Sequence, residues 1–366
     1  MLGRFQLNLI KKIDWKLLIA IVVLILFGLA AIYSLTMNQE NPDLSNFNKQ
    51  AIFFVIGLFF LFLFTIFDYR VFINYSFFIY VGGGVILLLV LFFGQTIRGS
   101  TSWFSLFGWT FQPVELAKIT LILYLSKYFS DNYSQMYQFK KIIVSALITL
   151  PYVLLVILQP DFGSAIILVI IWLGLLLLNR TKRIHVVIFI CLLIIIMIFS
   201  WFFVFEDYQK KRISTFINPS SDPLGAGYNP TQSIIAVGSG MFFGRGLGLG
   251  PQSQLNFLPV AEKDFIFAVI AEELGLFGAI ILLFFLFYVF KRMIKALREQ
   301  KNTFSLFLIS GITISLFSQA FINIAGNIGL LPITGIPLPF LSYGGSSLVT
   351  SLIMIGLIQS IIVRSR

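Results

Sequence analysis

Long runs of apolar residues, separated by short polar stretches, dominate this chain of 366 residues. A helix needs about 20 predominantly apolar residues to cross the roughly 30 Å hydrocarbon core of a bilayer. Runs of this kind occur at ten places, which cover residues 15–35, 50–67, 73–94, 113–130, 142–159, 162–179, 184–205, 264–290, 304–326 and 344–363. The pattern predicts an all-α polytopic integral membrane protein with about ten transmembrane helices and a single membrane domain over residues 1–366.

The positions of the basic residues predict the orientation of the chain. The net charge of +11 would also fit a nucleic-acid-binding protein, but eighteen of the 26 Lys and Arg residues fall in loops on one side of the predicted helices. By the positive-inside rule, both termini are expected in the cytoplasm, and nucleic acid is not an expected partner. Lys118 lies within an apolar run, and the opposite loops hold Lys49, Arg98, Lys210, Lys211, Arg212, Arg245 and Lys263.

The longest polar stretch, residues 206–263, lies between the seventh and eighth apolar runs. The charge distribution places this stretch on the extracytoplasmic side, and long loops often carry function. The cytoplasmic loops contain no glycine-rich strand-to-helix turn that could hold a nucleotide phosphate. We therefore expect chemistry on the outer side that does not use ATP or a nucleotide sugar.

Charged residues inside an apolar run are costly, so each one is a candidate functional residue. Glu115 and Lys118 are three residues apart, which places them on one face of a helix where they can pair. The pair is either structural or lines a hydrated cavity in which Lys118 meets an anionic group. Asp161, in a turn between two runs, is either a functional carboxylate or the cap of the following helix, and the two roles are compatible.

Asp264 stands at the outer mouth of the eighth run, where a carboxylate is well placed for acid-base chemistry; the alternative is that it caps the helix. In a helix, Glu272 would lie about 12 Å deeper, so a glycosidase-like carboxylate pair is not expected. The glycine-rich residues 238–250 favour a structural re-entrant turn, although Arg245 within it could meet a phosphate.

The ninth run carries a stripe of polar residues along one side. Gln319, Asn323 and Asn327 recur there every four residues. Hydrogen bonding between helices is the usual explanation for such a stripe, and lining of the same hydrated cavity is the alternative. A proline-rich outer segment, residues 331–347, follows and includes Ser342.

Together these segments resemble the SEDS family (shape, elongation, division and sporulation) over nearly the whole chain. The sequence Ile333-Thr334-Gly335-Ile336-Pro337 is more similar to the RodA branch of that family than to the FtsW branch. The resemblance implies ten spans in the bacterial cytoplasmic membrane and polymerisation of lipid II into glycan strands for cell elongation. It also implies that Asp264 corresponds to the family's essential aspartate, and that Trp103, Glu115, Lys118 and Asp161 fall in motifs associated with activity.

Polymerisation of lipid II needs a base for the acceptor hydroxyl and cations for the departing polyprenyl pyrophosphate. We assign the base to Asp264 as a hypothesis. A divalent cation, Mg²⁺ or Mn²⁺, is a further candidate. The residues predicted to bind substrate or line the cavity are Trp103, Glu115, Lys118, Asp161, Arg98, Arg212, Arg245, Gln319, Asn323 and Ser342.

The resemblance implies partners as well. A class B penicillin-binding protein, which is a transpeptidase, and other membrane proteins of the elongation complex are expected beside the chain. Two other functions stay open. A lipid II flippase would also use charges within the spans, and a non-catalytic scaffold for wall-synthesis proteins would need none of them.

Overall fold

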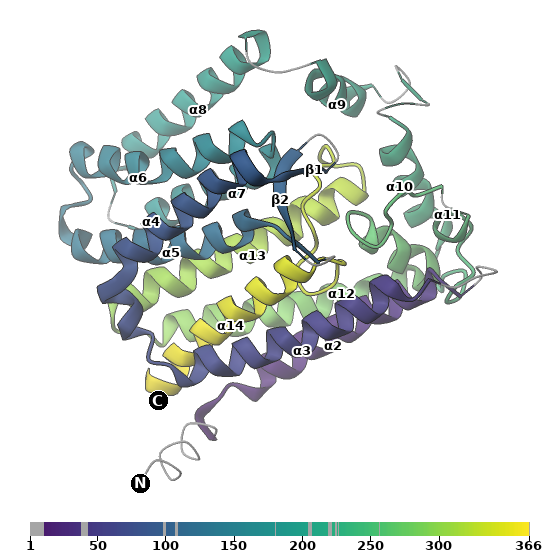
Figure 1. The fold of residues 1–366 in the computed structure, drawn as a ribbon, viewed down its shortest axis with the longest axis horizontal. Coiled ribbons are helices and arrows are strands. Elements are labelled where there is room, and N and C mark those ends of the chain that lie inside the picture. Colours follow the sequence, from purple (N-terminus) through teal and green to yellow (C-terminus); the bar gives the residue numbers. More distant parts are fainter. Residues whose placement is uncertain are drawn as a thin grey trace.

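The fold is that of a helical bundle, shown as a ribbon in Figure 1. This computed structural model describes residues 11–37, 43–97, 100–106, 109–179, 181–203, 207–218, 222–223, 225, 227–255 and 257–365. The predicted fold class is confirmed, because most of these residues are helical.

A long helix covers each of the ten predicted apolar runs. These helices are α2 (Trp15–Ser34), α3 (Ser45–Ile66), α4 (Arg70–Phe93), α5 (Pro113–Asp131), α6 (Phe139–Leu158), α7 (Phe162–Leu177), α8 (Arg183–Phe203), α12 (Ile266–Arg298), α13 (Thr303–Asn327) and α14 (Gly345–Ser365). Within the described residues, seven of them are both long and apolar enough to cross a bilayer, namely α2, α3, α4, α6, α12, α13 and α14. The chain is therefore a multi-pass membrane protein, while ten as the number of spans stays a prediction.

Helix α14 forms the centre of the bundle. In its most apolar 18-residue stretch 94% of the residues are buried, whereas in α3 and α4 the corresponding share is 22%. Helix α14 packs against α3, α12 packs against α2, and α13 packs against both α5 and α7. Large apolar side chains such as Phe92 and Phe93 are about three-quarters exposed on the outside of the bundle, as expected for a surface in contact with lipid.

A cluster of polar side chains joins three helices at the end of the bundle where the C-terminus lies. Asp14 is the N-cap residue of α2, and the guanidinium of Arg292 on α12 donates from Nε to its Oδ2 at 3.0 Å. Gln359 on α14 accepts from the backbone N–H of Asp14 at 3.0 Å and donates to its carbonyl at 3.1 Å. Each group of this buried cluster therefore has a partner, which fixes the ends of α2, α12 and α14 relative to each other.

A small antiparallel sheet precedes α5 and was not predicted. It consists of β1 (Gln95–Ile97), β2 (Ser100–Leu106) and β3 (Trp109–Phe111), in the order β1-β2-β3. The hydroxyl of Ser100 donates to the carbonyl of Gln159 at 2.7 Å, which ties β2 to the turn before α7. Figure 1 shows the sheet at the end of the bundle away from the C-terminus.

The long stretch between α8 and α12 is partly helical. It contains α9 (Asp207–Ile217), α10 (Tyr228–Ser239) and the single turn α11 (Pro251–Gln254). Helix α10 packs against α12 and α13, so this part of the predicted loop belongs to the body of the protein.

The glycine-rich segment, residues 238–250, provides hydrogen-bond partners where α12 is interrupted. Gly275 has φ 67° and interrupts the helical hydrogen bonds there. The carbonyls of Glu272 and Glu273 accept instead from the N–H groups of Arg245 and Gly246, at 2.9 and 3.0 Å. A Cβ on Gly244, which has φ 81°, would stand 2.1 Å from the carbonyl oxygen of Glu273. The structural interpretation of this segment is thus confirmed, because only glycine allows the close approach.

The side chains of Glu272 and Glu273 hold the same segment. Both oxygens of Glu272 accept backbone N–H groups at the start of α11, at 2.8 and 3.0 Å. Glu273 accepts from the Ser34 hydroxyl at 2.7 Å and from the Gly248 N–H at 3.1 Å. These two carboxylates therefore stabilise the loop.

Candidate active site

Asp264 lies immediately before α12 without being its N-cap residue. The N-cap position belongs to Phe265, which provides no side-chain hydrogen bond. The N–H of Ala268, in the first turn, donates instead to Oδ1 of Asn327 on α13 at 3.2 Å. The first turn of α12 thus receives a cap from another helix, and the capping alternative for Asp264 stays open.

The backbone of Asp264 is held by the polar stripe of α13. Its carbonyl accepts from Nδ2 of Asn323 at 3.0 Å and from Nδ2 of Asn327 at 2.9 Å. Asn323 also donates to the carbonyl of Ile336 at 2.8 Å. Interhelical hydrogen bonding, the usual explanation for such a stripe, is confirmed for Asn327, which accepts from Ala268 of α12, whereas Asn323 bonds two carbonyls that lie outside the helices.

Glu115 and Lys118 pair inside the protein as their spacing predicts. The distance between Lys118 Nζ and Glu115 Oε2 is 2.8 Å. The exposed fractions of the two residues are 3% and 2%, so the pair is almost completely removed from solvent. The hydroxyl of Thr350 on α14 lies 3.4 Å from the same carboxylate oxygen. Burial of two charges is tolerated because they neutralise each other.

Asp161 caps α7 and adds a second carboxylate to this cluster. Its Oδ1 accepts from the backbone N–H of Ser164 at 3.0 Å, and its Oδ2 accepts from the Ser164 hydroxyl at 2.8 Å and from Nε2 of Gln112 at 3.0 Å. Burial raises the pKa of Asp161, while the bonds from Ser164 and the charge of Lys118 oppose this shift. The predicted cap is confirmed.

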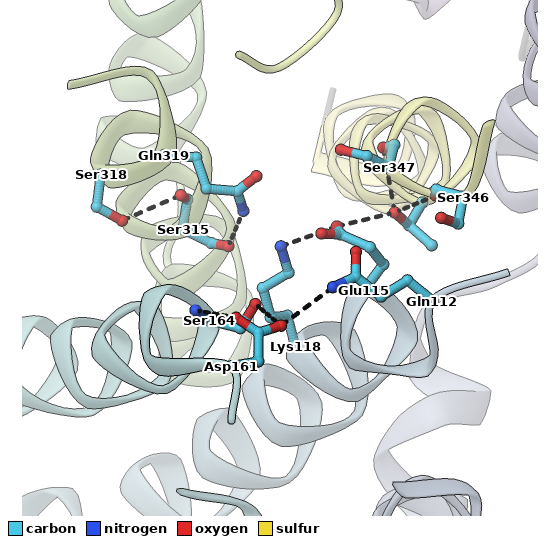
Figure 2. Close-up of polar contacts among 11 residues, drawn as sticks. Gln112, Glu115, Lys118, Asp161, Ser164, Ser315, Ser318, Gln319, Ser346 and Ser347 are labelled. Atoms are coloured by element: carbon cyan, nitrogen blue, oxygen red, sulfur yellow. Dashed lines mark hydrogen bonds and ion pairs between the residues drawn. The ribbon is translucent and has the colours of Figure 1, made fainter. Parts of the chain in front are cut away.

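Gln319 completes the buried cluster from the side of α13. Its Nε2 donates to the Ser315 hydroxyl at 3.2 Å, whereas its Oε1 is buried without a hydrogen-bond partner. Figure 2 shows Gln319, Lys118 and Asp161 facing one another, with Ser346 and Ser347 of α14 opposite. An unsatisfied buried carbonyl oxygen is costly, so this amide is suited to accept a bond from a ligand or a water molecule.

Helix α13 connects Asp264 to the buried cluster. Gln319 and Asn323 are four residues apart, which places them on the same face and about 6 Å apart along the axis. Gln319 lies beside Lys118, and Asn323 bonds the carbonyl of Asp264. A single helix face therefore brings together residues from four parts of the chain, at the end of the bundle that is expected to face outward.

The other predicted site residues are more dispersed. Trp103 is partly buried in β2, opposite Gln95 in the sheet. The hydroxyl of Ser342 accepts from the N–H of Leu338 at 2.9 Å and so stabilises the turn before α14. Arg245 is exposed in the glycine-rich segment. Arg98 and the side chain of Arg212 lie outside the described residues.

Several polar residues of the site were missed in the sequence. Gln112 and Ser315 contact the cluster directly, and Thr350 approaches Glu115. For Ser315 a signal was available, because it extends the stripe of Gln319, Asn323 and Asn327 by one more step of four residues. Thr350 gave no comparable signal, since it meets Glu115 through tertiary packing.

A metal site built from protein ligands does not fit the described part of the chain. No three His, Cys, Asp or Glu side chains come together there in a way that could hold an ion. The two carboxylates of the buried cluster, Glu115 and Asp161, already bond Lys118 and the start of α7 respectively. We therefore derive no step through the Mg²⁺ or Mn²⁺ ion considered above.

The helices and this site define a class of protein: a polytopic membrane protein with a buried charged cluster at one end of its bundle and an aspartate held beside it. A family model described as "Cell cycle protein", which groups FtsW, RodA and SpoVE, matches residues 15–366. The chain therefore belongs to the SEDS family, as its motifs indicated.

Relatives at the level of sequence cover almost the whole chain. Peptidoglycan glycosyltransferase MrdB of Escherichia coli strain K12 is 33% identical over 349 residues, covering 95% of this chain and 93% of MrdB. The probable peptidoglycan glycosyltransferase FtsW of Buchnera aphidicola subsp. Baizongia pistaciae is 36% identical over 359 residues, covering 93% of this chain and 91% of FtsW.

Solved structures show the same fold. A chain of a peptidoglycan synthase complex, described as coordinating polymerization and crosslinking, matches with a TM-score of 0.78 and 26% identity, covering 96% of this chain and 98% of that chain. The rod shape determining protein RodA of Thermus thermophilus matches with a TM-score of 0.70 and 25% identity, covering 97% of each chain.

Proposed function

We propose that this protein is a peptidoglycan glycosyltransferase that polymerises lipid II into glycan strands on the outer face of the bacterial cytoplasmic membrane. The main support is the placement of Asp264 and the Glu115–Lys118 cluster along one face of α13, within a chain that belongs to the SEDS family. Lipid II carries its own leaving group, polyprenyl pyrophosphate, so its polymerisation requires no nucleotide.

In this proposal Asp264 is the general base. A carboxylate at the outer start of α12 can take the proton from the acceptor hydroxyl as that oxygen attacks the anomeric carbon of the donor sugar. The bond from this carbon to the pyrophosphate breaks in the same displacement. Asn323 and Asn327 bond the backbone carbonyl of Asp264, so the backbone that carries this carboxylate is attached to α13.

Lys118 is the candidate group for stabilising negative charge. Its ammonium is buried with Glu115 and Asp161 around it, and the Oε1 atom of Gln319 is unpaired nearby. A preorganised charge in a site from which water is excluded stabilises a developing anion more strongly than a charge in solvent. The exposed Arg245 is a second candidate for contact with the pyrophosphate.

The distribution of polar groups along α14 favours an enzyme over a flippase. Ser346, Ser347, Thr350 and Ser351 occupy its first turns, whereas the residues from Leu352 to Ile358 are apolar or glycine and are buried. The next polar residue, Gln359, bonds the backbone of Asp14 at the end of the bundle where the C-terminus lies. A path for a charged headgroup across the bilayer needs polar lining along its length, and between Thr350 and Gln359 the central helix α14 offers only Ser351.

The assay that tests this function uses the purified protein and labelled lipid II. We expect glycan polymer to form and polyprenyl pyrophosphate to be released, with no added nucleotide. Movement of lipid II across vesicle membranes without polymer would contradict the proposal in favour of a flippase. Failure of both reactions by the folded protein would favour a scaffold.

We further propose that the enzyme acts in cell elongation with a class B penicillin-binding protein. Its RodA-like motif at residues 333–337 and the fold shared with RodA support the elongation role. The likeness to a synthase complex that coordinates polymerization and crosslinking supports the partner. The lipid-facing sides of α12 and α13 expose Phe277, Phe284 and Phe321 by 57–64%, which suits the transmembrane helix of such a partner.

Titration of the purified partner into the polymerisation assay at saturating lipid II tests activation. We expect the maximal rate to rise, because contact above α12 would favour the active arrangement of the segment that carries Asp264. The variant Phe284→Arg should reduce both complex formation and this rise, while the rate without partner is kept. A constant maximal rate despite a demonstrated complex would show that the partner only recruits the enzyme.

A further inference from the structure

The hydrogen bonds of Asn327 assign the orientation of its amide. Nδ2 donates to the Asp264 carbonyl at 2.9 Å, while Oδ1 accepts from the Ala268 N–H at 3.2 Å. The opposite orientation would place the amide oxygen against a carbonyl and the amino group against an N–H. Both polar atoms of this amide therefore bond the start of α12, Nδ2 before Phe265 and Oδ1 after it.

Asn323 joins the residue before α12 to the outer segment before α14. It donates to the Asp264 carbonyl at 3.0 Å and to the Ile336 carbonyl at 2.8 Å. The outer segment that contains Ile336 returns to the same region, because the N–H of Tyr343 donates to the Glu262 carbonyl at 2.8 Å. The short stretch from Glu262 to Asp264 is thus attached to α13 and to the segment before α14.

We propose that Asn323 and Asn327 are positioning residues that fix the carboxylate of Asp264 relative to Lys118. The inference rests on the proposed role of Asp264 as general base. Two amide donors occupy the carbonyl of Asp264, so its Cα cannot shift without loss of buried hydrogen bonds. Both amides are at least 95% buried, and they stand one and two helical turns from Gln319, which lies beside Lys118.

This arrangement predicts a kinetic effect that a purely stabilising role would not produce. A base that is displaced by about 1 Å can lose a factor of about 100 in rate even when the substrate still binds. We therefore expect Asn323→Ala and Asn327→Ala to lower kcat for lipid II polymerisation by roughly tenfold or more. The KM for lipid II should stay close to that of the unchanged protein, because both amides are engaged with backbone groups of the protein itself.

The variant Asn327→Asp separates positioning from capping. Its carboxylate still accepts the Ala268 N–H, as an N-cap does, but it cannot donate to the Asp264 carbonyl when ionised. We expect kcat to fall in this variant too. Ser310→Ala is the matched control on α13, because the Ser310 hydroxyl bonds the Leu306 carbonyl of its own helix and lies far from Asp264. It should leave kcat unchanged.

A double-mutant comparison decides whether the asparagines act through Asp264. In an Asp264→Asn background, the further change Asn327→Ala should reduce the residual rate little or not at all. Normal kcat in both Ala variants, with only a lower melting temperature, would overturn the positioning role while leaving Asp264 as the base. An equal loss with and without the Asp264 carboxylate would also overturn it. Near-normal activity of Asp264→Asn alone would instead refute the general base itself.

Discussion

The change Asp264→Asn is expected to abolish almost all lipid II polymerisation while the protein inserts, folds and melts as before. The substitution keeps the size of the side chain and removes only its ability to accept a proton. Loss of a general base lowers the rate by a factor of about 100 to 10,000, and a polymerase that adds many sugars in succession makes this loss easy to detect. The measurement is glycan chain formation per mole of folded protein.

The structure strengthens this test, because the capping alternative predicts little change. Asn caps a helix about as well as Asp, and the first turn of α12 is in any case capped by Asn327. Glu262→Gln provides a matched control, since it removes a charge two residues away on the same outer segment. We expect this control to retain most of the activity. A folded Asp264→Asn protein with near-normal turnover would contradict the assignment of Asp264 as the general base.

The positions of the long helices could be predicted because a bilayer imposes a simple length rule. Each apolar run of about 20 residues became a helix. The length rule fails where segments that are far apart in the sequence form hydrogen bonds with each other. The eighth run was expected to form one regular helix, but Gly275 breaks α12, and the N–H groups of Arg245 and Gly246 replace the missing partners. The short strands of the β1–β3 sheet are likewise fixed by pairing and not by an apolar period.

The candidate site shows the same division between local and distant contacts. The pairing of Glu115 with Lys118 and the cap by Asp161 follow from spacings of three residues, so the sequence was sufficient for both. The cap on α12 was not predictable, because Asn327 lies 59 residues from Ala268 along the chain. A cap from another helix leaves no local pattern, so the contribution of Asn327 could not be read from the residues around α12.

The Glu115–Lys118 pair gives the second large effect, which concerns stability and activity together. We expect each single change, Glu115→Met or Lys118→Met, to lower the melting temperature in detergent more than the double change does. Removal of one partner leaves an uncompensated buried charge, at a cost of about 3–5 kcal/mol, whereas removal of both leaves apolar side chains of suitable size. Strictly additive losses would mean that the two residues do not interact.

The two single variants are also expected to differ. Without Glu115, the ammonium of Lys118 still has the carboxylate of Asp161 nearby, because this carboxylate interacts electrostatically with both residues of the pair. Without Lys118, two carboxylates of like charge remain in the same buried region, so Lys118→Met should be the less stable variant. Activity then decides between the two interpretations of the pair. A structural pair predicts that the stable double variant still polymerises lipid II, whereas a role for Lys118 in stabilising the departing pyrophosphate predicts a folded, stable and inactive protein.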